Sequence, residues 1–149
     1  MRALIVEDDP VSRKHLEFIL APYAACETAE DGAAAVKAYH DALKKRKPFH
    51  LICMDILLPG MDGHQALEQI RQIEAKRGLP PGKCAKAFMV SAHNEPKNVS
   101  RSFFQGQALT FISKPYTEEE IVEELKKFGL VKDKPVKKSA RAGKKTEAQ

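Results

Sequence analysis

Residues 51–55 read LICMD, four apolar residues followed by a carboxylate. A short, continuous apolar run is typical of a strand that is buried on both faces, as in a parallel sheet. Three further apolar runs lead into polar residues in the same way: ALIV (3–6) before Glu7 and Asp8, AFMV (87–90) before Ser91, and LTFI (109–112) before Ser113 and Lys114. Because parallel strands end at one edge of their sheet, the pattern predicts one polar site at that edge.

Stretches with helical spacing separate the predicted strands. The expected strands span 3–6, 24–29, 49–54, 87–90 and 109–112, and the helices between and after them open at Pro10, Asp31-Gly32, Gln65, Glu95 and Thr117. In the first helix, the apolar residues Val11, Leu16, Phe18 and Ile19 and the neighbouring His15 recur at helical spacing. The alternation predicts an α/β fold: a doubly wound, five-stranded parallel sheet in the flavodoxin-like order 2-1-3-4-5, with helices on both faces.

The 149 residues favour one domain followed by a basic tail. Residues 1–129 hold 18 Lys/Arg and 18 Asp/Glu, so residues 130–149, with 7 and 2, carry the whole net charge of +5. We predict a folded domain over 1–129 and a disordered tail over 130–149, because the tail lacks aromatic residues and apolar periodicity. We expect a cytoplasmic location, since no apolar stretch approaches the length of a membrane span and no secretory signal opens the chain.

The predicted edge gathers acids that repel one another. Glu7, Asp8 and Asp55 would follow two neighbouring strands, and a hard divalent cation such as Mg²⁺ would relieve their repulsion. Lys114 adds an ammonium and Ser91 a hydroxyl, which together with the metal could surround the oxygens of a phosphoryl group. Asp55 would then be a nucleophile that becomes an aspartyl phosphate.

These residues resemble the receiver domains of two-component response regulators over residues 1–129. The likeness rests on four motifs in the family's order and spacing: VEDD (6–9), MDILLPGMDG (54–63), VSA (90–92) and FISKP (111–115). It implies that Asp55 accepts a phosphoryl group from a phosphohistidine on a sensor histidine kinase or phosphotransfer protein. It implies also that Asp8, Asp55 and the backbone carbonyl of Leu57 bind Mg²⁺, with Glu7 acting through water, and that Lys114 pairs with the phosphoryl group and precedes a cis peptide bond to Pro115.

The resemblance further implies a conformational switch. Ser91 would move toward the phosphoryl group, and Phe111, three residues before Lys114, would turn inward; a permanently buried Phe111 is the alternative. Four histidines, His15, His40, His50 and His64, form no metal-ligand spacing and are interpreted as surface or boundary residues. The signal would pass to a downstream protein that the sequence does not name, through a surface near the fourth helix, fifth strand and fifth helix, where a homodimer could also form.

Two other functions share this fold. A magnesium-dependent phosphatase with an aspartate nucleophile needs a second acid two residues after it, but Leu57 stands there. A flavodoxin-like small-molecule binder needs a phosphate-binding loop after the first strand, where three acids lie instead. We therefore expect a stand-alone, chemotaxis-type regulator that is a signalling protein and not an enzyme, without direct DNA binding. For the basic tail, a solvated extension and a binding segment for nucleic acid, an anionic membrane or an acidic partner all remain open.

Overall fold

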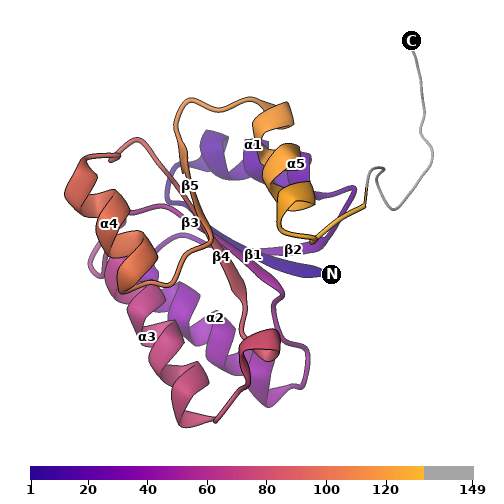
Figure 1. The fold of residues 1–149 in the computed structure, drawn as a ribbon, viewed down its shortest axis with the longest axis vertical. Coiled ribbons are helices and arrows are strands. Elements are labelled where there is room, and N and C mark those ends of the chain that lie inside the picture. The colour runs from indigo at the N-terminus through magenta and orange to yellow at the C-terminus, as the bar shows by residue number, and fades with distance from the viewer. Residues whose placement is uncertain (133–149) are drawn as a thin grey trace.

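A computed structural model describes residues 1–132 as one parallel sheet between two layers of helices (Figure 1). The sheet order is β2-β1-β3-β4-β5, which confirms the predicted fold class. The strands are β1 (Arg2–Val6), β2 (Ala25–Ala29), β3 (Leu51–Met54), β4 (Lys86–Ser91) and β5 (Thr110–Ser113). The helices are α1 (Pro10–Leu20), α2 (Gly32–Lys44), α3 (Gly63–Lys76), α4 (Pro96–Phe104) and α5 (Glu118–Lys127), and a 3₁₀ turn covers Pro81–Lys83.

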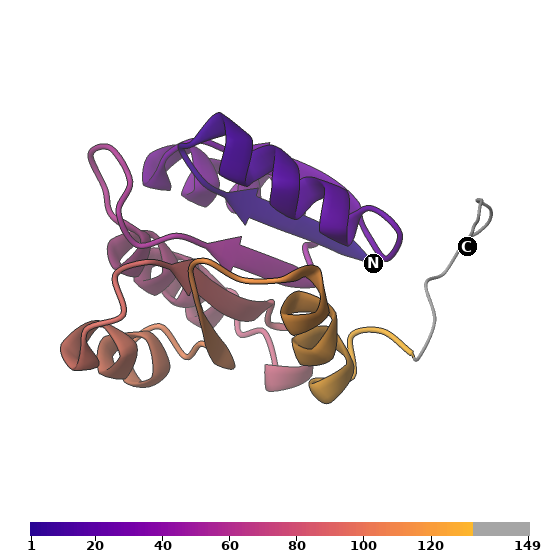
Figure 2. The same cartoon turned by 90° about the horizontal axis from the view of Figure 1, so that it is seen from above.

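The sheet divides the apolar core into two clusters. Alternate residues of the strands point to opposite faces: Leu4, Ile52 and Met89 pack under α2 and α3, whereas Ile5 and Phe88 pack under α1 and α5. Figure 2 shows β1 and β3 running in the same direction between these layers. Burial on both faces explains why the central strands β1, β3 and β4 read as apolar runs.

Side chains at the helix starts fix where four of the five βα loops end. Asp9, Asp31 and Asp62 accept hydrogen bonds from the backbone of α1, α2 and α3, and Thr117 does so for α5. Thr117, where the last helix was expected to begin, forms a capping box with Glu120, and a second one joins Asp62 to Gln65. Such caps satisfy backbone donors that the first turn leaves free.

Several expectations are wrong in detail. Val11 and Phe18 of the expected apolar pattern are 77% and 73% exposed, whereas Leu16 and Ile19 of the same pattern are buried, together with Leu20. Phe49 is buried but precedes β3. His64 is only 2% exposed, because it lies one turn into α3 beneath α4, where its Nε2 is 3.3 Å from Asn98 Oδ1. Its burial was missed because the contact joins residues 34 positions apart.

The end of the described chain continues the packing of α5. Leu130 and Val131 pack against the core cluster beneath α1 and α5. The remainder of the predicted tail, from residue 133, lies outside the described residues. No helix within residues 1–132 has the length and apolar composition that crossing a membrane requires.

Gly63 is the closest backbone contact between α3 and the loop after β3. Its N–H donates to the carbonyl of Ile56 at 2.7 Å, and a Cβ at this position would overlap the Asp55 carbonyl group, whose carbon would be 2.8 Å away. Only glycine lets the helix approach this backbone so closely.

We predict that Gly63→Ala lowers the free energy of unfolding by about 3 kcal/mol, since neither backbone can yield without moving the other. Gly82→Ala is the matched control, because a Cβ at Gly82 meets no atom within 4 Å and should change stability by less than about 0.5 kcal/mol. Urea unfolding of both variants and the native chain measures the difference. Equal midpoints for the two variants would contradict the close approach.

Buried His64 should make stability sensitive to acid. Burial, with the nearby Arg101 guanidinium, lowers the pKa of His64 below its ordinary value of 6.5. Below about pH 6.5 the unfolded chain therefore takes up a proton that the folded chain excludes, and stability falls as the pH falls. Relative to His64→Gln, the native chain should lose up to about 1.4 kcal/mol more per pH unit in that window. Urea unfolding at several pH values measures this, with exposed His40→Gln as control; parallel curves for native chain and His64→Gln would refute it.

Candidate functional site

The sheet brings the predicted polar residues to one edge. Glu7 and Asp8 follow β1, Asp55 follows β3, Ser91 ends β4, and Lys114 follows β5. Ladder-like hydrogen bonds continue past the strand ends: Asp55 N–H donates to the Val6 carbonyl at 3.0 Å, and Lys114 N–H to the Ser91 carbonyl at 3.0 Å. The backbone register therefore positions these side chains before any side-chain contact is made.

Three carboxylates form a cluster at this edge. Glu7, Asp8 and Asp55 each offer one oxygen, and these oxygens all lie within 4.8 Å of one another. Glu7 and Asp55 are buried, whereas Asp8 is exposed. At such separations the charges repel unless a cation compensates them.

Lys114 supplies one such cation. Its ammonium donates to Glu7 Oε1 and to Asp55 Oδ2, the latter at 2.9 Å. Burial disfavours the Lys114 charge, but the hydrogen bonds to both acids outweigh it and raise the pKa of Lys114. Burial also raises the pKa of Glu7, in spite of its hydrogen bond from Lys114. The ammonium therefore stays charged and neutralises part of the cluster.

Both oxygens of Asp55 are held in place. Oδ1 accepts a hydrogen bond from the Ile56 N–H at 2.7 Å, and Oδ2 accepts from Lys114. Asp55 is buried but retains 8% exposure, so a small part of it reaches solvent at the edge of the sheet. A fixed but accessible carboxylate is suited to react with a bound group.

The sequence analysis missed the role of Arg13 and assigned none to Asp9, the last residue of the acidic motif. Arg13 donates to the backbone carbonyls of Glu7 at 3.0 Å and Asp8 at 3.3 Å, and so holds the turn that carries both acids. Asp9 caps α1 through Ser12 N–H and is absent from the cluster. Only the position of Arg13 one turn into α1, next to the acidic turn, could have indicated its contact.

Within residues 1–132, the residues of the predicted switch make no side-chain hydrogen bond to the carboxylates. The Ser91 hydroxyl is buried and accepts a hydrogen bond from His93 N–H at 3.1 Å. Phe111 is half-buried, lies opposite Met89 in the β4–β5 register, and packs against the core cluster beneath α2 and α3. The Leu57 side chain is 62% exposed. The peptide bond between Lys114 and Pro115 is cis, as expected.

The donor set suits a hard cation. Three carboxylate oxygens within mutual reach, one of them on an exposed side chain, match the ligands that Mg²⁺ prefers, with room for water or phosphoryl oxygens. No nitrogen or sulfur ligand belongs to this group within residues 1–132. The site could therefore bind a divalent metal ion.

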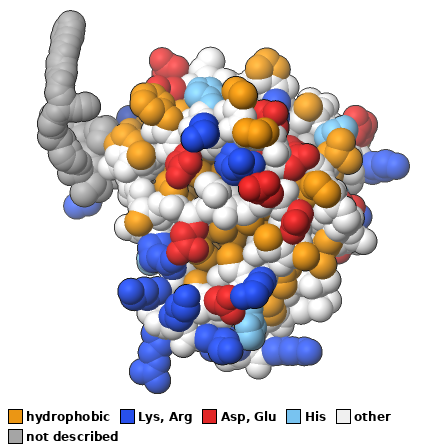
Figure 3. Space-filling model, turned by 180° about the vertical axis from the view of Figure 1, so that it is seen from behind, with side chains coloured by type: hydrophobic (Ala, Val, Ile, Leu, Met, Phe, Trp, Pro, Cys, Tyr) orange, Lys and Arg blue, Asp and Glu red, His pale blue; other side chains and the backbone are white. Residues whose placement is uncertain are grey.

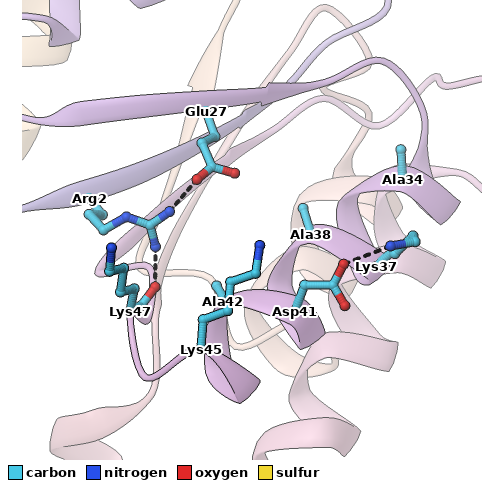
Figure 4. A pocket seen from close by; sticks show the side chains of 9 residues that line it. All are labelled: Arg2, Glu27, Ala34, Lys37, Ala38, Asp41, Ala42, Lys45 and Lys47. Carbon is cyan, nitrogen blue, oxygen red and sulfur yellow. Dashed lines mark hydrogen bonds and ion pairs between the residues drawn. The ribbon is translucent and has the colours of Figure 1, made fainter.

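A polar pocket lies at the end of the sheet opposite the acid cluster. It is about 510 Å³ in volume and lies between the start of β1, β2 and the end of α2 (Figure 4). Arg2 pairs with Glu27, and Lys37 pairs with Asp41 at 2.7 Å, so half of its four cations are already compensated. Figure 3 shows Lys and Arg side chains gathered toward this end of the molecule, where cations also suit the ends of α2 and α3.

Comparisons with known proteins agree with this arrangement. The sequence profile described as "Response regulator receiver domain" matches residues 3–126. The chemotaxis protein CheY of Bacillus subtilis is 34% identical over 128 residues, which are 85% of this chain and 95% of CheY. A chain of the solved CheX–CheY–BeF3–Mg²⁺ complex from Borrelia burgdorferi has a TM-score of 0.71 and 26% identity, and the match covers 86% of this chain and 89% of that chain.

Some relatives are much longer. The matched region of the sensor histidine kinase GacS of Pseudomonas protegens is 31% identical to 85% of this chain but makes up only 13% of that protein. The likeness to such proteins concerns one domain of theirs. From the profile match, the similarity to CheY along nearly its whole length and the acid cluster, we conclude that the chain belongs to the response regulator receiver domain family, the phosphoacceptors of two-component signalling, and is not a classical enzyme.

Proposed function

We propose that Asp55 is the phosphoacceptor of this receiver domain. The observation that carries the proposal is the cluster of Glu7, Asp8 and Asp55, in which the Lys114 ammonium lies 2.9 Å from Asp55 Oδ2. A carboxylate oxygen of Asp55 attacks the phosphorus of a phosphohistidine, and an O–P bond forms as the N–P bond to the histidine breaks. Lys114 then pairs with the phosphoryl oxygens, whose charge it partly compensates.

Mg²⁺ is the metal we propose for the acid cluster. Asp8, Asp55 and the backbone carbonyl of Leu57 would hold it, with Glu7 acting through water. The ion would supply positive charge that relieves the repulsion of the acids and binds phosphoryl oxygens. The Mg²⁺ and BeF3 named in the Borrelia complex support this assignment by similarity.

Ser91 and Phe111 are the proposed switch. The Ser91 hydroxyl, which here accepts from His93 N–H, would donate to a phosphoryl oxygen after phosphorylation, and Phe111 would turn into the space that it leaves. Phosphorylation shifts this equilibrium only by interacting better with one state, and a change from 1:99 to 99:1 takes about 5.5 kcal/mol. Phe111 has no hydroxyl, so its part would depend on packing alone.

The proposed partners follow from this chemistry. A sensor histidine kinase or phosphotransfer protein would donate the phosphoryl group, and the surface of α4, β5 and α5 would carry the signal to a downstream protein. The domain over residues 1–129 would act as a stand-alone, cytoplasmic regulator of the chemotaxis type. Its similarity to CheY of Bacillus subtilis, of which the match covers 95%, supports this arrangement.

Replacement of the acceptor tests the proposal directly. Asp55→Asn keeps the side-chain shape but removes the nucleophile, so incubation with acetyl phosphate and Mg²⁺ should add a phosphoryl group to the native chain and none to the variant. Intact-protein mass spectrometry measures the addition. The control is Asp62→Asn in the same loop, because asparagine also caps helices and should leave labelling unchanged. Labelled Asp55→Asn would place the acceptor elsewhere.

Adjacent acids allow a sharp test of the metal ligands. Asp8→Asn should weaken Mg²⁺ binding about tenfold or more, because a charged ligand is lost. Asp9→Asn should not, because Asp9 caps α1 and takes no part in the cluster. The chain has no tryptophan, so titration calorimetry is the suitable measurement. Equal weakening by both substitutions would mean that general charge, rather than ligation, governs binding.

A further inference from the structure

An acidic groove runs along the edge of the sheet between β5 and α5. It has a volume of about 560 Å³. One wall is the edge strand β5, from Thr110 to Ser113, and the other is α5, which contributes Glu119, Glu120, Glu123, Glu124 and Lys127. Phe111 of β5 is half-buried and borders the groove, although it packs against the core cluster on the other face of the sheet. The groove therefore combines a sheet edge with a row of carboxylates.

The carboxylates of the groove are poorly compensated. Within residues 1–132, no ion pair joins Glu119, Glu123 or Glu124 to a cation. Glu124 Oε1 is also shielded from solvent and has no hydrogen-bond partner in that part of the chain. A buried, unpaired carboxylate oxygen is costly, so the groove favours a ligand that brings cations and donors. The acid cluster at the carboxyl ends of the strands is better compensated, because Lys114 forms ion pairs with Glu7 and Asp55.

A segment of matching charge follows α5 in the same chain. Residues 132–145 contain Lys132, Lys134, Lys137, Lys138, Arg141, Lys144 and Lys145 against a single acid, Asp133. Lys132 lies just beyond Leu130 and Val131, which pack on the core beside α5. The groove extends along α5 from Glu119 to Lys127, about 12 Å at 1.5 Å per residue, and six extended residues reach about 20 Å.

We propose that the groove between β5 and α5 binds the chain's own basic segment, residues 132–145. The lysine and arginine side chains pair with Glu119, Glu123 and Glu124, and the segment lies along the edge strand β5. Attachment to α5 gives the segment an effective concentration in the millimolar range, so contacts that are individually weak suffice to fill the groove. This binding is independent of the phosphoacceptor role. Its consequence, competition with a downstream protein for the α4, β5 and α5 surface, rests on the proposed function.

Zero-length cross-linking of the full chain tests the contact. A carbodiimide should join lysines of 132–145 to Glu119, Glu123 or Glu124 at low ionic strength, and mass spectrometry identifies the joined peptides. We expect about a tenfold loss of these products in 0.5 M salt, because exposed charge pairs are screened. Products joined mainly to Asp8, Glu30 or other acids outside the groove would overturn the proposal, as would products that form only between two copies of the chain.

Paired variants test which carboxylates matter. Glu123→Gln with Glu124→Gln should reduce the cross-linked product about tenfold, whereas Glu30→Gln with Glu118→Gln removes the same charge outside the groove and should leave it unchanged. Equal losses in both pairs would show general attraction and overturn the assigned groove.

Amide chemical shifts in NMR spectra report occupancy of the groove without a cross-linking reaction. In the full chain, replacing Lys137, Lys138 and Arg141 by Gln should shift the amides of 110–113 and 119–127 and leave those of α2 and α3 in place. Unshifted groove amides would refute occupancy. Labelling of Asp55 by acetyl phosphate, measured on the same samples, reports the phosphoacceptor role separately, so failure of either proposal is distinguishable from failure of the other.

Discussion

Repulsion among carboxylates is the constraint on which this molecule depends. Neighbouring parallel strands lie about 4.8 Å apart, so acids placed directly after β1 and β3 must come together at one edge of the sheet. The core fixes both strands, and the acids cannot move apart without breaking its packing. Lys114, which follows β5 on the far side of β4, reduces the repulsion through ion pairs with Glu7 and Asp55. Its ammonium satisfies only part of the negative charge, and the remaining charge is what makes a divalent cation and a phosphoryl group favourable at the same place.

The parts of the fold that depend on local sequence patterns could be predicted from the sequence. Continuous apolar runs located four of the five strands, and Thr117 marked the start of the last helix, because these signals involve residues close together in the chain. Contacts between distant residues were missed. Arg13 reaches back to the acidic turn, His64 lies beneath α4, and buried Glu74 of α3 accepts hydrogen bonds from Tyr39 of α2 and from the Ala85 N–H before β4. Helical spacing also included exposed Phe18 in the apolar pattern of α1, because the period alone cannot tell where the buried stripe ends.

The geometry explains how the edge can react without loosening the fold. The backbone of Asp55 is joined to β1 by a hydrogen bond and lies against Gly63 of α3, so the proposed phosphoacceptor stands on rigid support. Ser91 is different, since within residues 1–132 its hydroxyl makes one hydrogen bond, which it accepts from the N–H of His93. The hydroxyl proton is not used in that bond, so it is available to a new acceptor at little structural cost. The division between a rigid acceptor and a weakly held hydroxyl is what a two-state response requires.

Charge segregation links the edge of the sheet to the groove on α5. Residues 1–129 are neutral in sum, yet cations gather where α2 and α3 end, while acids gather at the phosphoacceptor edge and along α5. The basic segment after Lys132 is repelled by the first region and attracted by the other two. At the phosphoacceptor edge it must compete with Lys114, which is already hydrogen-bonded to two of the acids, and with any bound cation. Along α5, no cation of residues 1–132 forms an ion pair with Glu119, Glu123 or Glu124. The basic segment also follows α5 directly in the chain, so charge attraction and chain connectivity both favour the groove.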